Sequence, residues 1–143
     1  MSFPIDIDKF VNLNFTLGDG LSNQERDDLT KNIGLMRDAI VATTVVARAK
    51  GIGGHTGGPY DIVPEVIIID ALRDGGAPIH DEFFDEAGHR SALQYVRGAI
   101  RGKLDTEKLM HYREYGSGLA GHPEAERSEE RRVGKECRSR WSP

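Results

Sequence analysis

The sequence SNQERDDLTKNIGLMRDAIVATTVVARAK occupies residues 22–50 and predicts one long helix on which the rest of the chain can pack. Ser22 and Glu25 have the spacing of a capping box, in which each side chain satisfies a backbone N–H that the start of a helix leaves unpaired. Residues that can form a buried stripe then recur at helical spacing: Leu29, Ile33, Met36, Ile40 and Thr44. We expect the helix to end near Lys50, since Gly51 follows, and to be weakened at Gly34.

The segment after this helix is predicted less uniquely. Residues 51–60, GIGGHTGGPY, form a glycine-rich loop, and Pro64 stands where the first turn of a helix tolerates proline. Residues 66–72 are a continuous apolar run that fits either a buried helix or a buried strand, because periodicity alone does not separate the two. Residues 74–76, Asp-Gly-Gly, then mark a clear break.

Two further helices are predicted toward the C-terminus. Residues 77–88 are expected to form a loop anchored by Phe83 and Phe84. Residues 91–101 have helical spacing through Leu93, Val96 and Ile100. Asp105 can cap another helix that runs to about Tyr112, and the Gly-Ser-Gly sequence at residues 116–118 ends it.

The two ends differ from the middle of the chain. Residues 1–20 are a mixed lead-in segment that supplies apolar contacts and ends in the turn Gly18-Asp19-Gly20. Residues 21–124 are the main domain. Residues 125–143 are rich in Arg, Glu and Ser and are expected to be disordered. Their last ten residues resemble a translated vector or adapter string, which suggests a foreign tail; a natural basic tail is the alternative.

Composition excludes several classes of partner. The 143 residues carry a net charge of −4, with +2 on residues 126–143 and −6 on the rest. An acidic body without a basic stripe argues against binding to nucleic acid. No apolar run approaches the roughly 20 residues that cross a membrane, no secretory signal is visible, and the single cysteine, Cys137, cannot form an internal disulfide. We therefore expect a cytoplasmic protein with no membrane partner.

Three short segments place a histidine beside a glycine: GGHTGGP at 53–59, AGHRSAL at 87–93 and LAGHPE at 119–124. Glycine lets the backbone approach a ligand closely, and histidine can donate, accept or relay a proton near neutral pH. Together they predict one polar pocket, although each histidine alone also fits an ordinary surface or capping role. His80 and His111 are interpreted as surface residues, and no spacing supports a zinc site, a dinucleotide fingerprint or a nucleophile elbow.

These segments resemble the N-terminal cofactor domain of the transketolase family over residues 22–124. That family shows Ser-Gly-His-Pro-Gly-Ala-Pro, then Asn-Gly-His before a helix beginning Ala-x-Ala-Leu-x-Tyr, then Phe-Arg-Gln-x-Gly-Ser-x-x-Pro-Gly-His-Pro-Glu. The matching stretches here are 53–59, 87–95 and 112–124. Thr56, Ala87 and Ala120 depart from the pattern and leave the substrate open.

The resemblance implies the α/β thiamine diphosphate-binding fold, of which only the mostly helical N-terminal part is present, so that residues 21–124 are a partial N-terminal domain. It implies transfer of a two-carbon ketol unit between sugar phosphates, with thiamine diphosphate and Mg²⁺ as cofactors and a homodimer as the full-length enzyme. By the same resemblance His55 and His122 are catalytic and contact substrate. Arg113 lines the substrate channel, and His89 and His122 contact the cofactor.

The resemblance also sets an expectation about activity. The family's metal motif and activating glutamate match nothing in this chain, so we expect the chain alone to be inactive. Alternatives are a small subunit that acts with separate partners, a non-catalytic domain that binds sugar phosphates or a partner, and an all-helical regulatory protein.

Overall fold

The computed structural model describes residues 2–80 and 88–121, and within these ranges the chain is helical and contains no strand. The helical elements are η1 (Ile7–Lys9), α1 (Asn23–Ala49), α2 (Gly57–Asp61), α3 (Val63–Asp74), α4 (Ser91–Ile100) and η2 (Thr106–His111). The mostly helical architecture agrees with the expected N-terminal part of the family fold, whereas the sheet of the full α/β fold is absent from the described residues. None of these helices is long and apolar enough to cross a membrane.

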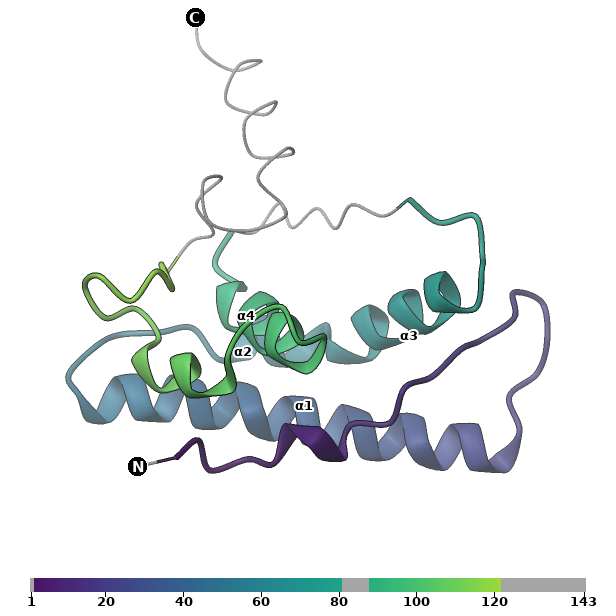
Figure 1. The fold of residues 1–143 in the computed structure, drawn as a ribbon, viewed down its shortest axis with the longest axis horizontal. Helices are drawn as coiled ribbons and strands as arrows, with labels where there is room; N and C mark the ends of the chain where they lie inside the picture. Colours follow the sequence, from purple (N-terminus) through teal and green to yellow (C-terminus); the bar gives the residue numbers. More distant parts are fainter. Residues whose placement is uncertain (1, 81–87, 122–143) are drawn as a thin grey trace, which may run out of the picture.

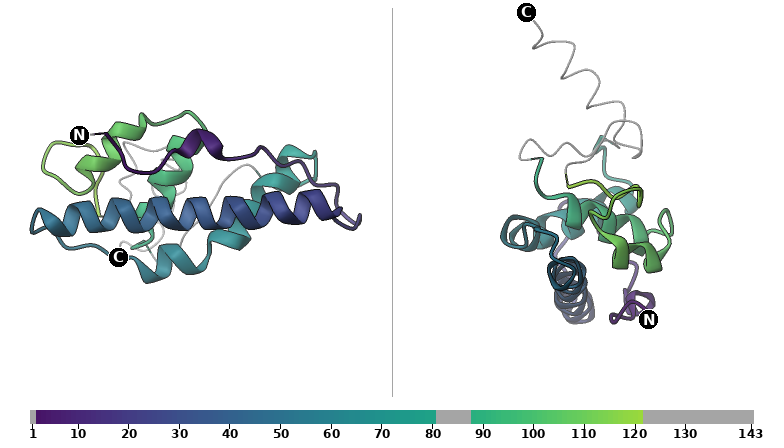
Figure 2. Two further views of the ribbon diagram at one scale, coloured as in Figure 1. Left: turned by 90° about the horizontal axis from the view of Figure 1, so that it is seen from below. Right: turned by 90° about the vertical axis from the view of Figure 1, so that its left-hand side faces the viewer.

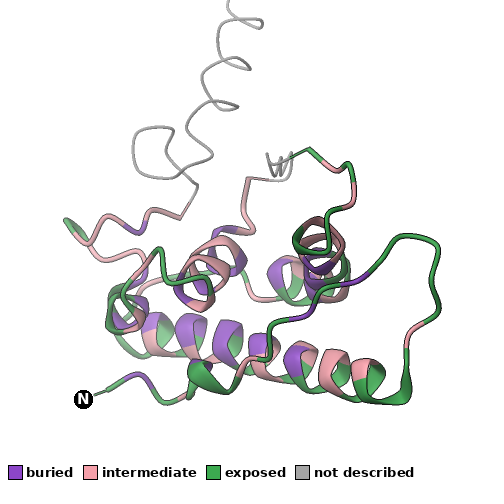
Figure 3. Ribbon diagram, turned by 45° about the vertical axis from the view of Figure 1, so that its right-hand side comes forward, coloured by how far each residue is buried: buried purple, intermediate pink, exposed green. Residues whose placement is uncertain are grey.

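Helix α1 is the scaffold, as predicted. The Ser22 N–H donates to Glu25 Oε2 over 2.7 Å and the Glu25 N–H donates to Ser22 Oγ over 3.3 Å, so the capping box is confirmed. Figures 1 and 2 show α1 running the length of the molecule with the other elements laid against it. Its buried residues face the other helices (Figure 3), and Met36 and Ile40 are among them, 2% and 0% exposed. Gly51, at φ +76°, ends the helix where expected.

The ambiguous apolar run at residues 66–72 is helical. Pro64 lies in the first turn of α3, and the buried residues Val63, Val66, Ile67 and Ala71 recur at helical spacing, which places them on one face. Ile68 points away and is 38% exposed. A half-exposed helix satisfies its own backbone without strand partners, so packing against α1 decides the ambiguity that composition leaves.

Two local predictions need adjustment. Residues 57–60 were predicted as loop but belong to α2, because the Tyr60 N–H donates to the Thr56 carbonyl over 3.0 Å and Pro59 packs into the core. Proline fits here because the first turn of a helix needs no N–H from it. The element after Asp105 is a 3₁₀ helix, η2, and the predicted cap is present, since Asp105 Oδ1 accepts the Glu107 N–H over 3.0 Å.

The lead-in segment is part of the core. Residues 3–15, here called the N-terminal strap, run antiparallel to α1 (Figure 1) and bury four side chains: Phe3, Ile7, Leu13 and Phe15. Asn32, itself 1% exposed, accepts the Val11 N–H at Oδ1 (2.9 Å) and donates from Nδ2 to the Val11 carbonyl (2.7 Å). One side chain thus replaces the backbone pairing that a sheet would provide.

One further prediction about the loops is confirmed, and the others concern residues that the structure does not describe. The turn at residues 18–20 is present, with Gly18 at φ +96° and the Asp19 N–H donating to the Thr16 carbonyl over 3.2 Å. The expected anchors Phe83 and Phe84, and the tail at 125–143, lie outside the described residues.

Ion pairs join α3 to α4 and lead to a prediction about acid stability. Arg101 donates to both oxygens of Asp74, over 3.1 and 3.0 Å, and these hydrogen bonds hold the pKa of Asp74 below its ordinary value of 3.8. A lowered pKa stabilises the fold above the unfolded-state pKa, and this contribution is lost as the pH falls through the folded-state pKa. We therefore expect Asp74→Asn to be less stable than the parent above about pH 4 and to converge with it below that value.

Urea unfolding midpoints measured between about pH 2 and 6 check this expectation. Asp19→Asn is the matched control, because the Asp19 side chain is exposed and makes no hydrogen bond or ion pair in the described ranges. Parallel curves for the parent and Asp74→Asn would contradict the prediction.

Candidate functional site

Two of the three Gly-His segments meet in space. His55 lies in the loop between α1 and α2, and His89 immediately precedes Arg90 and the first turn of α4. Their rings form an edge-to-face contact, with centroids 5.2 Å apart and planes at 62°. The His55 side chain is exposed and the His89 side chain is half-buried, so neither imidazole belongs to the closed core. Residues 34 positions apart in the sequence thus form one small polar surface.

Glycine makes this approach possible. A Cβ atom at Gly58 would lie 3.2 Å from His89 Nε2, and one at Gly54 would lie 3.5 Å from the ring of Tyr112. Both loops therefore pack backbone against ring with little room for a side chain. The Thr56 hydroxyl donates to the Thr44 hydroxyl on α1 over 2.9 Å, which fixes the loop where the family pattern has a proline.

The third segment is fastened to the same turn of α4. Ser91 Oγ donates to the Gly121 carbonyl over 2.8 Å and lies 2.8 Å from the Tyr112 hydroxyl. The Tyr95 hydroxyl donates to the Ala120 carbonyl over 3.0 Å. The backbone at Gly121 is thereby held to Ser91, which follows His89 by two residues. His122 itself lies outside the described residues.

Arg113 is held by an unusual backbone conformation. Its φ is +62°, the one positive value among the described non-glycine residues, and its N–H donates to the Leu119 carbonyl over 2.8 Å. A Cβ atom at Gly121 would lie 2.6 Å from Arg113 Nε, so the guanidinium packs directly on that glycine. Arg113 therefore lies beside the backbone that leads into His122.

A surface ion-pair group holds the turn that carries Arg113. Glu114 accepts from Lys50, at the end of α1, and from His111 Nδ1 over 2.8 Å. These hydrogen bonds, that from Lys50 first, lower the pKa of the Glu114 carboxyl. Lys50 also donates to the Met110 carbonyl over 2.8 Å. His111 and His80 are exposed, in agreement with their interpretation as surface residues.

Ser91 and Tyr112 are the contributors that sequence reasoning missed. Tyr112 is 1% exposed; its ring lies under Gly54 and its hydroxyl meets Ser91, which bonds to Gly121. One buried side chain thus contacts or connects to all three Gly-His segments. The sequence did contain a clue to this contact, because residue 112 is tyrosine where the family pattern has phenylalanine. A buried tyrosine hydroxyl needs a hydrogen-bond partner.

The hydrogen-bond donors at this site suit the diphosphate of the expected cofactor, but the side chains present do not suit its metal ion. Two imidazoles and the open backbone of Gly53 and Gly57, which have no atom within 4 Å of a Cβ position, fit the oxygens of a diphosphate. A metal fits less well, because no group of three His, Cys, Asp or Glu side chains in the described ranges could hold one.

Comparison with curated proteins identifies the relationship. The transketolase of Staphylococcus epidermidis (strain RP62A) is 33% identical over 93 residues, which cover 61% of this chain and 14% of that protein. The probable transketolase of Schizosaccharomyces pombe is 32% identical over 110 residues, which cover 72% of this chain and 16% of that protein. This chain is a homologue of the transketolases.

Further comparisons show how much of the transketolases this chain matches. The transketolase of Staphylococcus aureus (strain N315) is 30% identical over 93 residues. The chain spans 14–16% of the length of the curated transketolases it matches. No family model matches the chain. No solved structure matches it either. In this transketolase homologue, Thr56 and Tyr112 depart from the family pattern and each adds a hydrogen bond at the site.

Proposed function

We propose that His55, His89, Arg113 and His122 form one side of a site for a transketolase-type transfer of a two-carbon ketol unit between sugar phosphates. The observation that supports it most directly is the contact between His55 and His89. The fastening of Gly121 to the same turn of α4 adds the third segment. Thiamine diphosphate, when bound, supplies the carbon–carbon bond chemistry.

Each residue has a role that its position permits. His55 is exposed on a glycine-rich loop, so its imidazole can hydrogen-bond a sugar hydroxyl and move a proton from it. His89 is half-buried beside Gly58 and the start of α4, where a diphosphate oxygen would also meet backbone N–H groups. Arg113 offers a guanidinium fork for a substrate phosphate, and His122 is assigned to the donor ketose and the cofactor by the family pattern.

We further propose that the 143 residues do not turn over substrate by themselves. The chain spans 14–16% of its curated relatives, and the described ranges contain no group of three metal-ligating side chains. Magnesium and a second copy of a full-length chain are therefore assigned to the complete cytoplasmic enzyme. A non-catalytic domain that binds sugar phosphate is the second candidate, favoured by the same combination of imidazoles and arginine without a metal group.

Binding measured on the purified chain tests the site. Calorimetric titration with fructose 6-phosphate, and separately with thiamine diphosphate and Mg²⁺, is compared for the parent, His55→Ala and His89→Ala. A hydrogen bond to a charged group contributes about 1.5–3 kcal/mol, so we expect His89→Ala to weaken binding of thiamine diphosphate about 10- to 100-fold. A hydrogen bond between neutral groups contributes about 0.5–1.5 kcal/mol, so we expect His55→Ala to weaken binding of fructose 6-phosphate about 2- to 10-fold. His80→Ala, an exposed histidine elsewhere, should leave both affinities unchanged.

The pattern of losses separates the candidates. Weakening of thiamine diphosphate by His89→Ala supports the cofactor-dependent site, whereas sugar-phosphate binding with no thiamine diphosphate binding supports the non-catalytic domain. Equal affinities in the parent and both variants would overturn the site. Ketol transfer by the purified chain with both cofactors supplied would overturn the proposed inactivity.

A further inference from the structure

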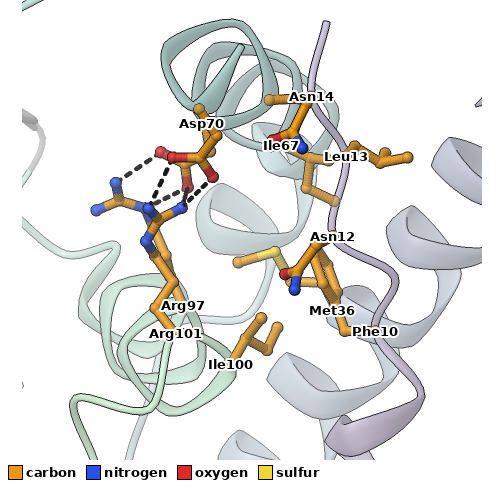
Figure 4. A pocket seen from close by; sticks show the side chains of 12 residues that line it. Phe10, Asn12, Leu13, Asn14, Met36, Ile67, Asp70, Arg97, Ile100 and Arg101 are labelled. Atoms are coloured by element: carbon orange, nitrogen blue, oxygen red, sulfur yellow. Dashed lines mark hydrogen bonds and ion pairs between the residues drawn. The ribbon is translucent and has the colours of Figure 1, made fainter. Parts of the chain in front are cut away.

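A hollow of about 460 Å³ lies at the opposite end of α4 from the Gly-His segments. Its walls are the N-terminal strap on one side and the last turns of α3 and α4 on the other (Figure 4). This volume lies within the range of about 300–1,000 Å³ that is typical of small-molecule pockets. None of its lining residues belongs to the site proposed above.

The strap wall is fixed before any ligand arrives. Asn32 bonds both backbone groups of Val11, and the Phe15 N–H donates to the Ala71 carbonyl over 2.9 Å. These attachments lie on both sides of Asn12 and Asn14, so the segment between them has little freedom. A preformed wall lowers the entropy that binding must overcome.

The floor of the hollow is apolar and its rim is polar but balanced in charge. Side chains that are nearly inaccessible form the floor: Met36, Ile67 and Ala71. At the rim, Arg97 donates to both oxygens of Asp70, each over 2.7 Å, and Arg101 pairs with Asp74 in the same way. Two carboxylates and two guanidinium groups give the lining no net charge, so the lining has no net electrostatic attraction for an anion over a neutral ligand.

Two amides at the hollow have unused hydrogen-bonding capacity. Asn12 and Asn14 are exposed on the strap, line the hollow opposite the ion pairs, and make no hydrogen bond within the described residues. Each amide offers two N–H donors and one carbonyl acceptor. The side chain of Leu13 lies on the other side of the strap, away from the hollow (Figure 4), because residues alternate along an extended segment, and it is buried there.

We propose that this hollow binds one neutral sugar ring. A monosaccharide has an apolar C–H face for the floor and hydroxyl groups that both donate and accept, which match the amides of Asn12 and Asn14. The ion pairs are already formed, so the carboxylates are oriented without a cation from the ligand. The site is independent of the ketol-transfer proposal, since it shares no residue with it.

A titration followed by ¹H–¹⁵N correlation spectra tests the proposal on the intact chain. D-Glucose and D-ribose are the probes, and we expect a dissociation constant on the order of 1–10 mM, as for a small ligand with few contacts. Backbone signals of residues 10–14 and 97–101 should shift, and those of His55 and His89 should not. The double variant Asn12→Ala/Asn14→Ala should bind at least about fivefold more weakly.

Controls make the outcome decisive. Asn23→Ala alters an exposed asparagine away from the hollow and should bind like the parent. Inorganic phosphate should leave the signals of residues 10–14 unshifted. The proposal is overturned if neither sugar shifts these signals, if phosphate shifts them as strongly, or if the double variant binds like the parent. The Gly-His site is tested separately by the calorimetric titrations of the His55→Ala and His89→Ala variants, so failure of one proposal is distinguishable from failure of the other.

Discussion

Replacing Gly75 by alanine is expected to lower the free energy of unfolding by about 2–4 kcal/mol, as overpacking against a rigid neighbour does. A Cβ atom at Gly75 would lie 2.1 Å from the Phe15 carbonyl oxygen and 2.8 Å from its carbon. The obstacle is backbone, and the strap cannot withdraw easily, because the Phe15 N–H donates to the Ala71 carbonyl and the Phe15 ring is 4% exposed. Relief of the clash therefore breaks a hydrogen bond and exposes an aromatic ring.

Gly34→Ala is the matched control for this prediction. Gly34 lies in the middle of α1, is exposed, and has no atom within 4 Å of its Cβ position. Alanine there should raise the free energy of unfolding by about 0.5–1 kcal/mol, because it reduces the freedom of the unfolded chain and favours helix. Urea unfolding of the three proteins measures both effects, and a Gly75→Ala protein as stable as the parent would show that the strap is loosely attached.

The fold was predictable where its signals are local. The capping box of Ser22 and Glu25 and the stripe that follows define α1 within one continuous stretch, and the structure agrees from Asn23 to Ala49. The apolar run at 66–72 could not be resolved in the same way, because isoleucines suit both helix and strand. The answer depends on α1, which covers one face of the run and leaves Ile68 exposed.

The strap could not be predicted because its attachments are distant in sequence. Asn32 bonds Val11 across 21 positions, and the Phe3 N–H donates to Glu107 Oε1 across 104. A buried asparagine on the inner face of α1 was the available clue, since a buried amide must find partners. Nothing in the local pattern shows that those partners are the backbone groups of Val11.

The candidate site was predictable in its outline but not in its connections. The repeated Gly-His pairs and the family pattern placed His55 and His89 together, and the structure brings their rings into contact. Their roles, and that of His122, remain predictions. The hydroxyl pair of Ser91 and Tyr112 depends on how α4 and η2 cross, and that geometry is set by the whole core.

Replacing Tyr112 by alanine is expected to lower the free energy of unfolding by about 3–5 kcal/mol, as loss of a buried aromatic ring does. Tyr112→Phe keeps the ring and removes the hydroxyl that meets Ser91 over 2.8 Å, so a smaller loss of about 1–2 kcal/mol is expected. The ring stacks edge-on against Tyr95, with centroids 6.0 Å apart, and lies under Gly54. Tyr112→Ala therefore measures the packing of the ring together with the hydroxyl, whereas Tyr112→Phe measures only the hydroxyl that connects the ring to the third Gly-His segment.

A double-mutant cycle on Tyr112→Phe and Ser91→Ala isolates that connection. Because both single variants remove the same hydrogen bond, the double variant should lose less than their sum, with a coupling of about 1 kcal/mol. The carbonyl ¹³C chemical shift of Gly121 should change more in Ser91→Ala than in Tyr112→Phe, since Ser91 alone bonds the Gly121 carbonyl directly. Additive losses would mean that the two hydroxyls act separately, and the three Gly-His segments would then be held by independent contacts instead of through one buried tyrosine.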